Sequence, residues 1–390
     1  MTNAGATMQA QDHTKARALV DELLAEFLGK NAHARDLSER LAERTGTRLA
    51  DWVDSIEVPL TARERARFGA AGFAHRPAPG SPEHHAREGA GLPSLILGNS
   101  MTVRVGVRVD SVADFLAAWR LEHPVDGEPF SQFRASLAFH GQYADLHVVE
   151  RHGYRGFTPV YNSEHQRLMS VRHAETFRRR HRDFGVDDAA ESRGVEHTLR
   201  MVESAVHDLG RDWACDLFFA AEREYWQRRC RAGLAQKAAQ DTLGLGWGNH
   251  HRHVYRASER TGVGLSALLG KLGFKETEGG SAGAPASRTF EQPVAGIVVD
   301  VEAADGPAGE VARWCALHGE SLLQGGLRGL VCRAGITGHG GPGVEPCPIE
   351  PKRLEAAVSR GVLKEAEAAR LRAEGAEGSI VVRAGVRGAV

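Results

Sequence analysis

Hydrophobic positions change their spacing several times along the chain, and these changes predict its elements. Residues 12–45 carry apolar residues three and four positions apart, as amphipathic helices do. From residue 51 a strand-like stretch leads into a helical pattern that begins at Thr61, a type of residue that caps helices, and stops near Gly72. Another apolar strand follows at residues 92–97. The pattern predicts one unit of strand, helix and strands.

The same order of elements recurs further along the chain. Residues 102–110 alternate between apolar and polar side chains and precede a helical stretch with a cap at Ser111. Residues 145–150 predict the last strand of this second copy. A third copy begins near His250, and a fourth, less regular one near Leu327.

Residues 164–242, between the second and third copies, have only helical periodicity and predict a helical insertion. We therefore expect an α+β fold built from repeated βαβββ modules. The expected divisions are N-terminal helices at 1–50, a first pair of modules at 51–160, the insertion at 161–245, and a second pair, the last one degraded, at 246–390.

Composition excludes several classes of protein. The chain has 390 residues, 42% of them hydrophobic, and 50 acidic residues nearly balance 49 basic ones. Such a balance gives no overall attraction to nucleic acid or to a membrane surface, and no apolar run approaches the roughly 20 residues that span a bilayer. The first 14 residues lack an export signal, and the five cysteines form no C-x-x-C pair, so we expect a cytoplasmic protein.

Histidines are concentrated at the start of the third copy. Strand alternation places His251, His253 and Tyr255 on one face and His250 and Arg256 on the other. Imidazoles two residues apart on a strand can bind one divalent ion, because neutral imidazole is a common ligand of zinc, iron and copper. The alternative is a solvated strand edge, or histidines that only form hydrogen bonds within the fold.

Two further groups of residues are candidates for a site. Glu150 ends an otherwise apolar strand, and a carboxylate buried there needs a cation. That cation is either a metal ion or an arginine such as Arg151, Arg104 or Arg256. His318 and Glu320 are candidates for metal ligands or acid–base groups, and the alternative is a simple helix cap.

Repeated modules with a histidine near a first strand and a glutamate on a last strand resemble the vicinal oxygen chelate superfamily. This resemblance implies that βαβββ modules pair into open barrels around one metal. Within the superfamily, the segment Glu150-Arg151-His152-Gly153 with Thr158-Pro159, together with His250, His253 and Arg256, is similar to the 2-oxoadipate dioxygenase/decarboxylase family. That similarity implies Fe(II) held by two histidines and a glutamate; Zn or Mn are alternatives.

The sequence therefore predicts a mononuclear metal-dependent enzyme, preferably a dioxygenase. Its ligands would come from His250, His251, His253 and Glu150, and its substrate would be a small oxygen-chelating molecule such as a 2-oxo acid, catechol or enediolate. The catalytic candidates are Arg256, Tyr255, His318 and Glu320; Arg256 would pair with a substrate carboxylate and Tyr255 would donate a proton.

Other functions remain open at this point. The first alternative is a metal-free protein of the same fold that binds a small molecule, and the second is an interaction protein that uses the helical insertion. The resemblance also suggests a homodimer.

Overall fold

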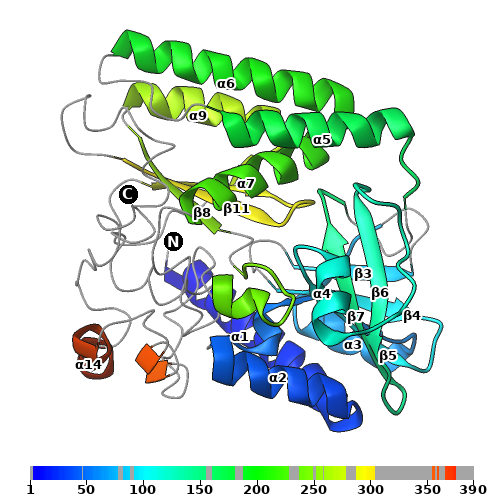
Figure 1. The fold of residues 1–390 in the computed structure, drawn as a ribbon. Helices are drawn as coiled ribbons and strands as arrows, with labels where there is room; N and C mark the ends of the chain where they lie inside the picture. Colours follow the sequence, from blue (N-terminus) through cyan, green and yellow to red (C-terminus); the bar gives the residue numbers. More distant parts are fainter. Residues whose placement is uncertain are drawn as a thin grey trace.

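A computed structural model gives the arrangement of most of the chain. It describes residues 3–45, 47–77, 82–87, 92–154, 160–180, 188–227, 237–248, 252–257, 259–277, 287–303, 354–355, 358–359 and 365–374. Within them, the strands form two open sheets, each packed against helices by its own hydrophobic core (Figure 1). The fold is thus of mixed α and β type, as predicted.

The first sheet has seven strands in the order β2-β3-β4-β1-β5-β7-β6. Their bounds are β1 Val53–Pro59, β2 Ala74–His75, β3 Glu83–Ala86, β4 Ser94–Gly98, β5 Val103–Arg108, β6 Phe133–Phe139 and β7 Ala144–Arg151. β1 pairs in parallel with β4 and antiparallel with β5, and β5 pairs in parallel with β7. Each parallel pair needs a crossover connection, which α3 and α4 supply.

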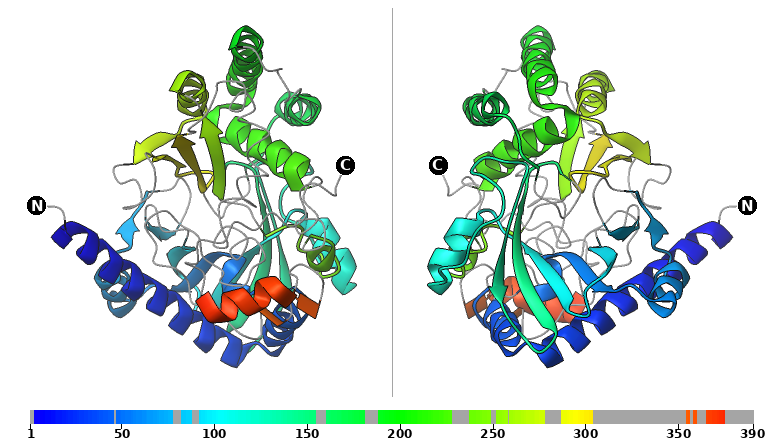
Figure 2. Two further views of the ribbon diagram at one scale, coloured as in Figure 1. Left: turned by 90° about the vertical axis from the view of Figure 1, so that its left-hand side faces the viewer. Right: turned by 90° about the vertical axis from the view of Figure 1, so that its right-hand side faces the viewer.

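Helices cover one face of this sheet. Their bounds are α1 Asn3–Lys30, α2 Ala32–Thr45, the 3₁₀ turn η1 Leu49–Asp51, α3 Ala62–Ala70 and α4 Val112–Trp119. Ile56, Val105 and Leu146 point from three adjacent strands into the core that these helices share. Arg104 and Arg108 alternate with the core residues along β5, so their side chains point to the opposite face of the sheet. Figure 2 shows α1 and α2 running beneath the sheet.

The second sheet has four strands in the order β8-β11-β10-β9. Its strands are β8 Arg252–Ala257, β9 Lys275–Thr277, β10 Ser287–Gln292 and β11 Ile297–Ala303. Four helices pack with it: α5 Glu164–Arg179, α6 Asp188–Leu209, α7 Arg211–Gln227 and α9 Glu259–Lys271. A separate helix, α14, spans Glu365–Glu374. Phe218, Leu268 and Val299 are members of one core from α7, α9 and β11.

Most of the predicted elements in the described residues are present. Thr61 and Ser111 cap α3 and α4, each accepting a hydrogen bond from the backbone N–H three residues on. The helices α5, α6 and α7 lie within the range predicted to be a helical insertion. β1–α3–β2–β3–β4 and β8–α9–β9–β10–β11 follow the predicted order of one strand, one helix and three strands.

Three details differ from the prediction. The first helix, α1, is longer than expected, and β6 lies in a region that the sequence predicted only as a loop. The second unit has two strands after its helix instead of three. The predicted fourth copy lies almost wholly outside the described residues, so its strands remain predictions.

Candidate functional site

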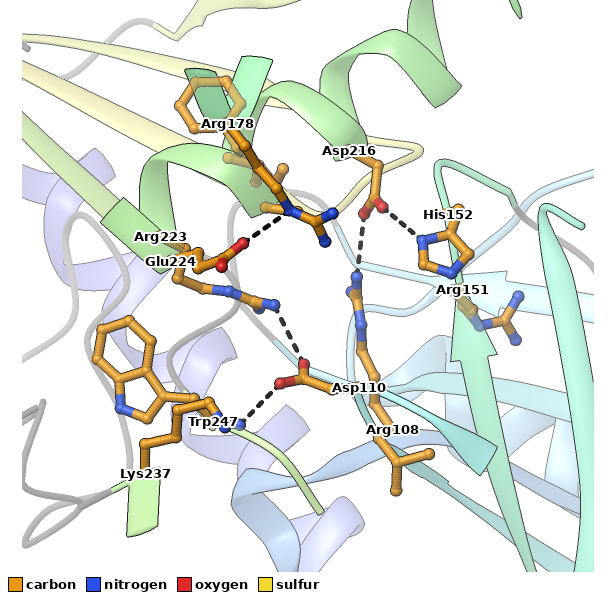
Figure 3. A pocket seen from close by; sticks show the side chains of 14 residues that line it. Arg108, Asp110, Arg151, His152, Arg178, Asp216, Arg223, Glu224, Lys237 and Trp247 are labelled. Carbon is orange, nitrogen blue, oxygen red and sulfur yellow. Dashed lines mark hydrogen bonds and ion pairs between the residues drawn. The ribbon is translucent and has the colours of Figure 1, made fainter. Parts of the chain in front are cut away.

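A cavity of 410 Å³ lies where β5 and β7 end against α7 (Figure 3). The two strands are parallel neighbours, so their carboxyl ends meet at one edge of the sheet. Five basic residues line the cavity: Arg108, Arg151, Arg178, Arg223 and Lys237. Three acidic residues accompany them: Asp110, Asp216 and Glu224. The lining is therefore highly charged and has more basic than acidic residues, although Arg151 and Lys237 pair with carboxylates outside it, Asp54 and Asp241.

Helix α7 supplies one wall. Asp216 and Arg223 are seven residues apart, which is two helical turns, so they lie on one face of the helix. The buried Ala214, Cys215 and Phe218 belong to the core beneath the second sheet. The sequence of α7 thus combines a core face with a polar face, and the polar face meets the ends of β5 and β7.

Glycine lets the two layers approach closely. Gly153 follows the end of β7 with φ +63°, a left-handed conformation that favours glycine. A Cβ atom at this position would overlap the backbone of Asp212 at the start of α7. The contact between β7 and α7 therefore depends on a residue without a side chain.

A chain of alternating charges runs from the sheet to the cavity. Arg134 on β6 donates to Oε2 of Glu150 at 3.2 Å. His152 lies between two carboxylates: its Nε2 is 3.1 Å from Oε1 of Glu150, and its Nδ1 is 3.0 Å from Oδ2 of Asp216. The other oxygen of Asp216 accepts from Arg108 at 3.3 Å. Buried charges that alternate in this way offset one another's desolvation.

The same arrangement sets the protonation of His152. Burial lowers the pKa of an imidazolium, but hydrogen bonds and charge from Asp216 and Glu150 outweigh it and raise the pKa of His152 to about 9. Burial also raises the pKa of each carboxyl group, yet His152 reverses this effect, and the pKa of Glu150 and of Asp216 lies below its ordinary value. At neutral pH we therefore expect His152 to be charged and to donate from both ring nitrogens.

A second set of polar contacts closes the cavity on its other side. Asp110, just after β5, accepts from Arg223 at 3.1 Å and from the backbone N–H of Trp247 at 3.0 Å. Gly246 has φ +76°, and a Cβ atom there would overlap the Asp110 carboxylate. Figure 3 shows Asp110 between Arg108 and Arg223. Arg178 on α5 bonds to Glu224 at 2.8 Å.

Glu150, the predicted carboxylate ligand, is already surrounded by donors. Its Oε2 accepts from the backbone N–H of Val112 at 3.1 Å as well as from Arg134, and its Oε1 faces His152. Two cations thus occupy the space around this carboxylate, so its surroundings do not fit a metal ligand. Its metal role stays a prediction.

The arginine that pairs with Glu150 is not one of those that the sequence suggested. Arg151 bonds to Asp54 at 2.7 Å, and Arg104 pairs with Glu57 at 3.5 Å. Arg104 and Arg151 point to the other face of the sheet because they alternate with the core residues of their strands. Arg134 lies opposite Glu150 in the register of β6 and β7, and this cross-strand position brings the two together.

Two further predicted residues, His253 and Tyr255, lie buried on β8. The ring of His253 packs on Phe219 of α7, with 4.6 Å between the ring centroids, and Tyr255 belongs to the core under the second sheet. Phe219 also lines the cavity, so His253 lies directly behind one of its walls. Both positions fit a packing role, and their ligand and catalytic roles stay predictions.

The remaining predicted residues are not described. His250, His251, His318 and Glu320 lie outside the described residues, as does the side chain of Arg256, whose backbone belongs to β8. Among the side chains that are described, no group of three or more histidines, cysteines, aspartates or glutamates is arranged to hold a metal ion.

Most of the residues that line the cavity were not predicted from the sequence. Arg108, Asp110 and His152 stand directly at the ends of predicted strands, and parallel strands bring such residues together. Their position at the ends of predicted strands is the sequence feature that could have identified them as site residues. Asp216 and Arg223 carry no comparable signal, because two charges on a long helix are more often solvated.

Comparisons with known proteins found no relative. No family model matches the chain, no curated protein matches it, and no solved structure matches its fold. In the part of the chain that the structure describes, no helix has the length and hydropathy to cross a membrane.

Proposed function

We propose that this protein binds a small organic anion in the cavity between α7 and the ends of β5 and β7. The observation that carries the proposal is the imbalance between donors and acceptors there. Each of the three cavity carboxylates already accepts a hydrogen bond from the protein: Asp110 from Arg223, Asp216 from Arg108 and Glu224 from Arg178.

Arg108 shows the imbalance most clearly. A guanidinium has five N–H donors, and the hydrogen bond from Arg108 to Asp216, at 3.3 Å, uses one of them. Its side chain is 22% exposed, so most of its surface is withdrawn from bulk water. Arginine held in this way recognises carboxylate and phosphate oxygens. A cavity of 410 Å³ is within the usual range for small-molecule sites.

Ligand-observed magnetic resonance tests this proposal. A mixture of small carboxylic acids and phosphate monoesters is titrated with the full chain at pH 7, and we expect saturation transfer to at least one anion. Arg108→Gln should weaken that signal about tenfold or more, since one charge-assisted bond contributes about 1.5–3 kcal/mol. Arg65→Gln is the matched control because Arg65 pairs with Glu83 on another part of the sheet. Equal signals from both variants would contradict the proposal.

A second proposal is the enzyme expected from the sequence, a metal-dependent dioxygenase of vicinal oxygen chelate type. It is supported by strand order: β2-β3-β4-β1 and β8-β11-β10-β9 both place a module's first strand beside its last, in parallel. Pairing of such modules into open barrels, a cytoplasmic location and a homodimer belong to the same proposal.

Metal analysis distinguishes the two proposals. After anaerobic loading with Fe(II), the metal enzyme should retain one ion per chain, and His253→Ala should abolish its retention. Phe219→Leu is the control, because it alters the packing around His253 without removing a nitrogen ligand. Wild-type protein without bound metal that still binds the anion supports the first proposal and contradicts the second.

A further inference from the structure

The geometry of Arg108 favours an anion that presents two oxygens side by side. A guanidinium presents two edges, each with two parallel N–H groups, and its Nη2 atom contributes one hydrogen to each edge. The single bond from Nη2 to Asp216 takes one of these hydrogens. Whichever hydrogen it takes, the other edge keeps both of its N–H groups. Two parallel N–H groups match two oxygens of a carboxylate or of a phosphate, so the choice between these anions depends on the rest of the cavity.

Asp216 holds this guanidinium in place. Its Oδ1 accepts from Arg108, and its Oδ2 faces the Nδ1 of His152. The carboxylate is 8% exposed and both of its oxygens are engaged, so it has little freedom to rotate. Asp216 thus reaches from α7 to fix a side chain of β5. It acts through Arg108, and is therefore a positioning residue.

The rest of the cavity is not uniformly charged. Phe219, Trp247 and Ile297 also line it, and each is nearly buried, with 2%, 5% and 3% of its surface exposed. Val109 and Ala220 contribute further apolar surface. A ligand that fills the cavity therefore covers the small apolar surface that these side chains still expose as well as the arginines, which favours a molecule with an apolar part.

We propose that the ligand is an organic monocarboxylate with an apolar body, whose carboxylate binds Arg108 and whose body lies against Phe219 and Trp247. This inference rests on the proposed anion-binding function and narrows its ligand class. Inorganic phosphate, a tetrahedral ion with no apolar part, is the natural comparison. Phosphate pairs with the positive charge of Arg108, but it has no apolar part that contacts the apolar wall formed by Phe219, Trp247 and Ile297.

Calorimetric titration with benzoate and with inorganic phosphate tests the ligand class. We expect the full chain to bind benzoate at least tenfold more tightly than phosphate at pH 7. Arg108→Lys keeps the charge but loses the paired N–H groups, which match carboxylate and phosphate oxygens alike, so it should weaken both ligands about tenfold. Arg65→Lys should change neither affinity, because Arg65 pairs with Glu83.

Two other variants test the apolar wall and the positioning role. Ala220→Phe fills the cavity from α7 and should weaken benzoate at least tenfold while phosphate binding remains. Asp216→Asn should weaken benzoate three- to tenfold, and this loss should vanish when Arg108 is already glutamine, because the proposed effect of Asp216 on the ligand is to position Arg108. An equal loss in both backgrounds would show that Asp216 has a merely structural role.

The outcomes of these experiments distinguish an error in the ligand class from an error in the proposed anion-binding function. If phosphate binds as tightly as benzoate and Arg108→Gln weakens both, the anion site stands and the monocarboxylate class is wrong. If Ala220→Phe leaves benzoate affinity unchanged, the proposed contact between the body of the ligand and the apolar residues of the cavity is wrong. If Arg108→Gln changes neither affinity in a protein that keeps its thermal unfolding midpoint, the proposed function fails together with this inference.

Discussion

His152 shows how a single residue links the charges of this site. Its ring joins Glu150, at the end of β7, to Asp216 on α7. From sequence alone, His152 was one member of a polar segment that follows a strand. Its importance comes from Asp216, which lies 64 residues further along the chain. A contact at this separation depends on the packing of a helix on a sheet edge, and no local pattern encodes it.

The first prediction concerns the pH dependence of His152. Because the folded protein raises the pKa of His152 from 6.5 to about 9, its stabilising contribution is complete below pH 6.5 and is lost as the pH rises through 9. His152→Gln should therefore lower the free energy of unfolding by about 2–3 kcal/mol at pH 6 and by much less at pH 10. Urea unfolding at both pH values measures the difference. A loss that is the same at both would contradict the charged state of His152.

At the scale of elements, helices and their caps were the most predictable features. Thr61 and Ser111 marked two helix starts correctly because a cap is a local hydrogen bond. β6 was missed, since its alternation is short and follows a loop rich in proline and glycine. The partner of Glu150 was missed for the same reason, because Arg134 lies on that strand.

The helical layer contains a fully buried ion pair. Arg180, at the end of α5, bonds to Glu222 on α7 at 2.5 Å, and both side chains are 0% exposed. Thr198 on α6 lies beside the same guanidinium, 3.4 Å from its Nη1. The pair therefore joins three helices of the insertion. Burial of both charges makes each dependent on the other.

The second prediction follows from this pair. Glu222→Ala leaves a guanidinium buried without its carboxylate, which should lower the free energy of unfolding by about 3–5 kcal/mol. Glu175→Ala removes an exposed partner of Arg179 on the same helical layer and should cost less than about 1 kcal/mol. Urea unfolding measures both. Similar losses for the two variants would show that the buried pair has no special role.

At the scale of the whole molecule, two hydrophobic cores meet at a polar boundary. One core lies under the seven-stranded sheet and the other under the four-stranded sheet. Helix α7 crosses the boundary with Asp216 and Arg223, which bond to Arg108 and Asp110 at the carboxyl end of β5. The candidate site thus lies between two packed layers, where ligand sites are common.

The third prediction concerns the coupling of these layers. Replacing Asp216 and Arg223 together by alanine removes polar contacts across the boundary but leaves both cores intact. We expect calorimetry to show one unfolding transition for the wild-type chain and two for this variant. Arg65→Ala combined with Glu83→Ala removes an ion pair within one layer and should keep a single transition. A single transition in both variants would mean that other contacts couple the layers.

The order of strands was more predictable than the site that they support. Repeated spacing of strand, helix and strands predicted the order of elements in β1–α3–β2–β3–β4 and in β8–α9–β9–β10–β11, because each module is a local unit. The cavity instead combines residues from β5, β7, α5 and α7, and the long insertion separates the two sheets in the sequence. Such a combination is a property of the assembled layers.

The central claim is that the cavity beside Arg108 binds an organic anion. Crystals grown with 4-bromobenzoate test it most directly, because the anomalous signal of bromine locates the ligand independently of the refined protein. We predict a bromine peak among Phe219, Trp247 and Ile297, with the carboxylate within hydrogen-bond distance of Arg108. Full occupancy of the ligand at another place, with this cavity filled only by water, would contradict the account.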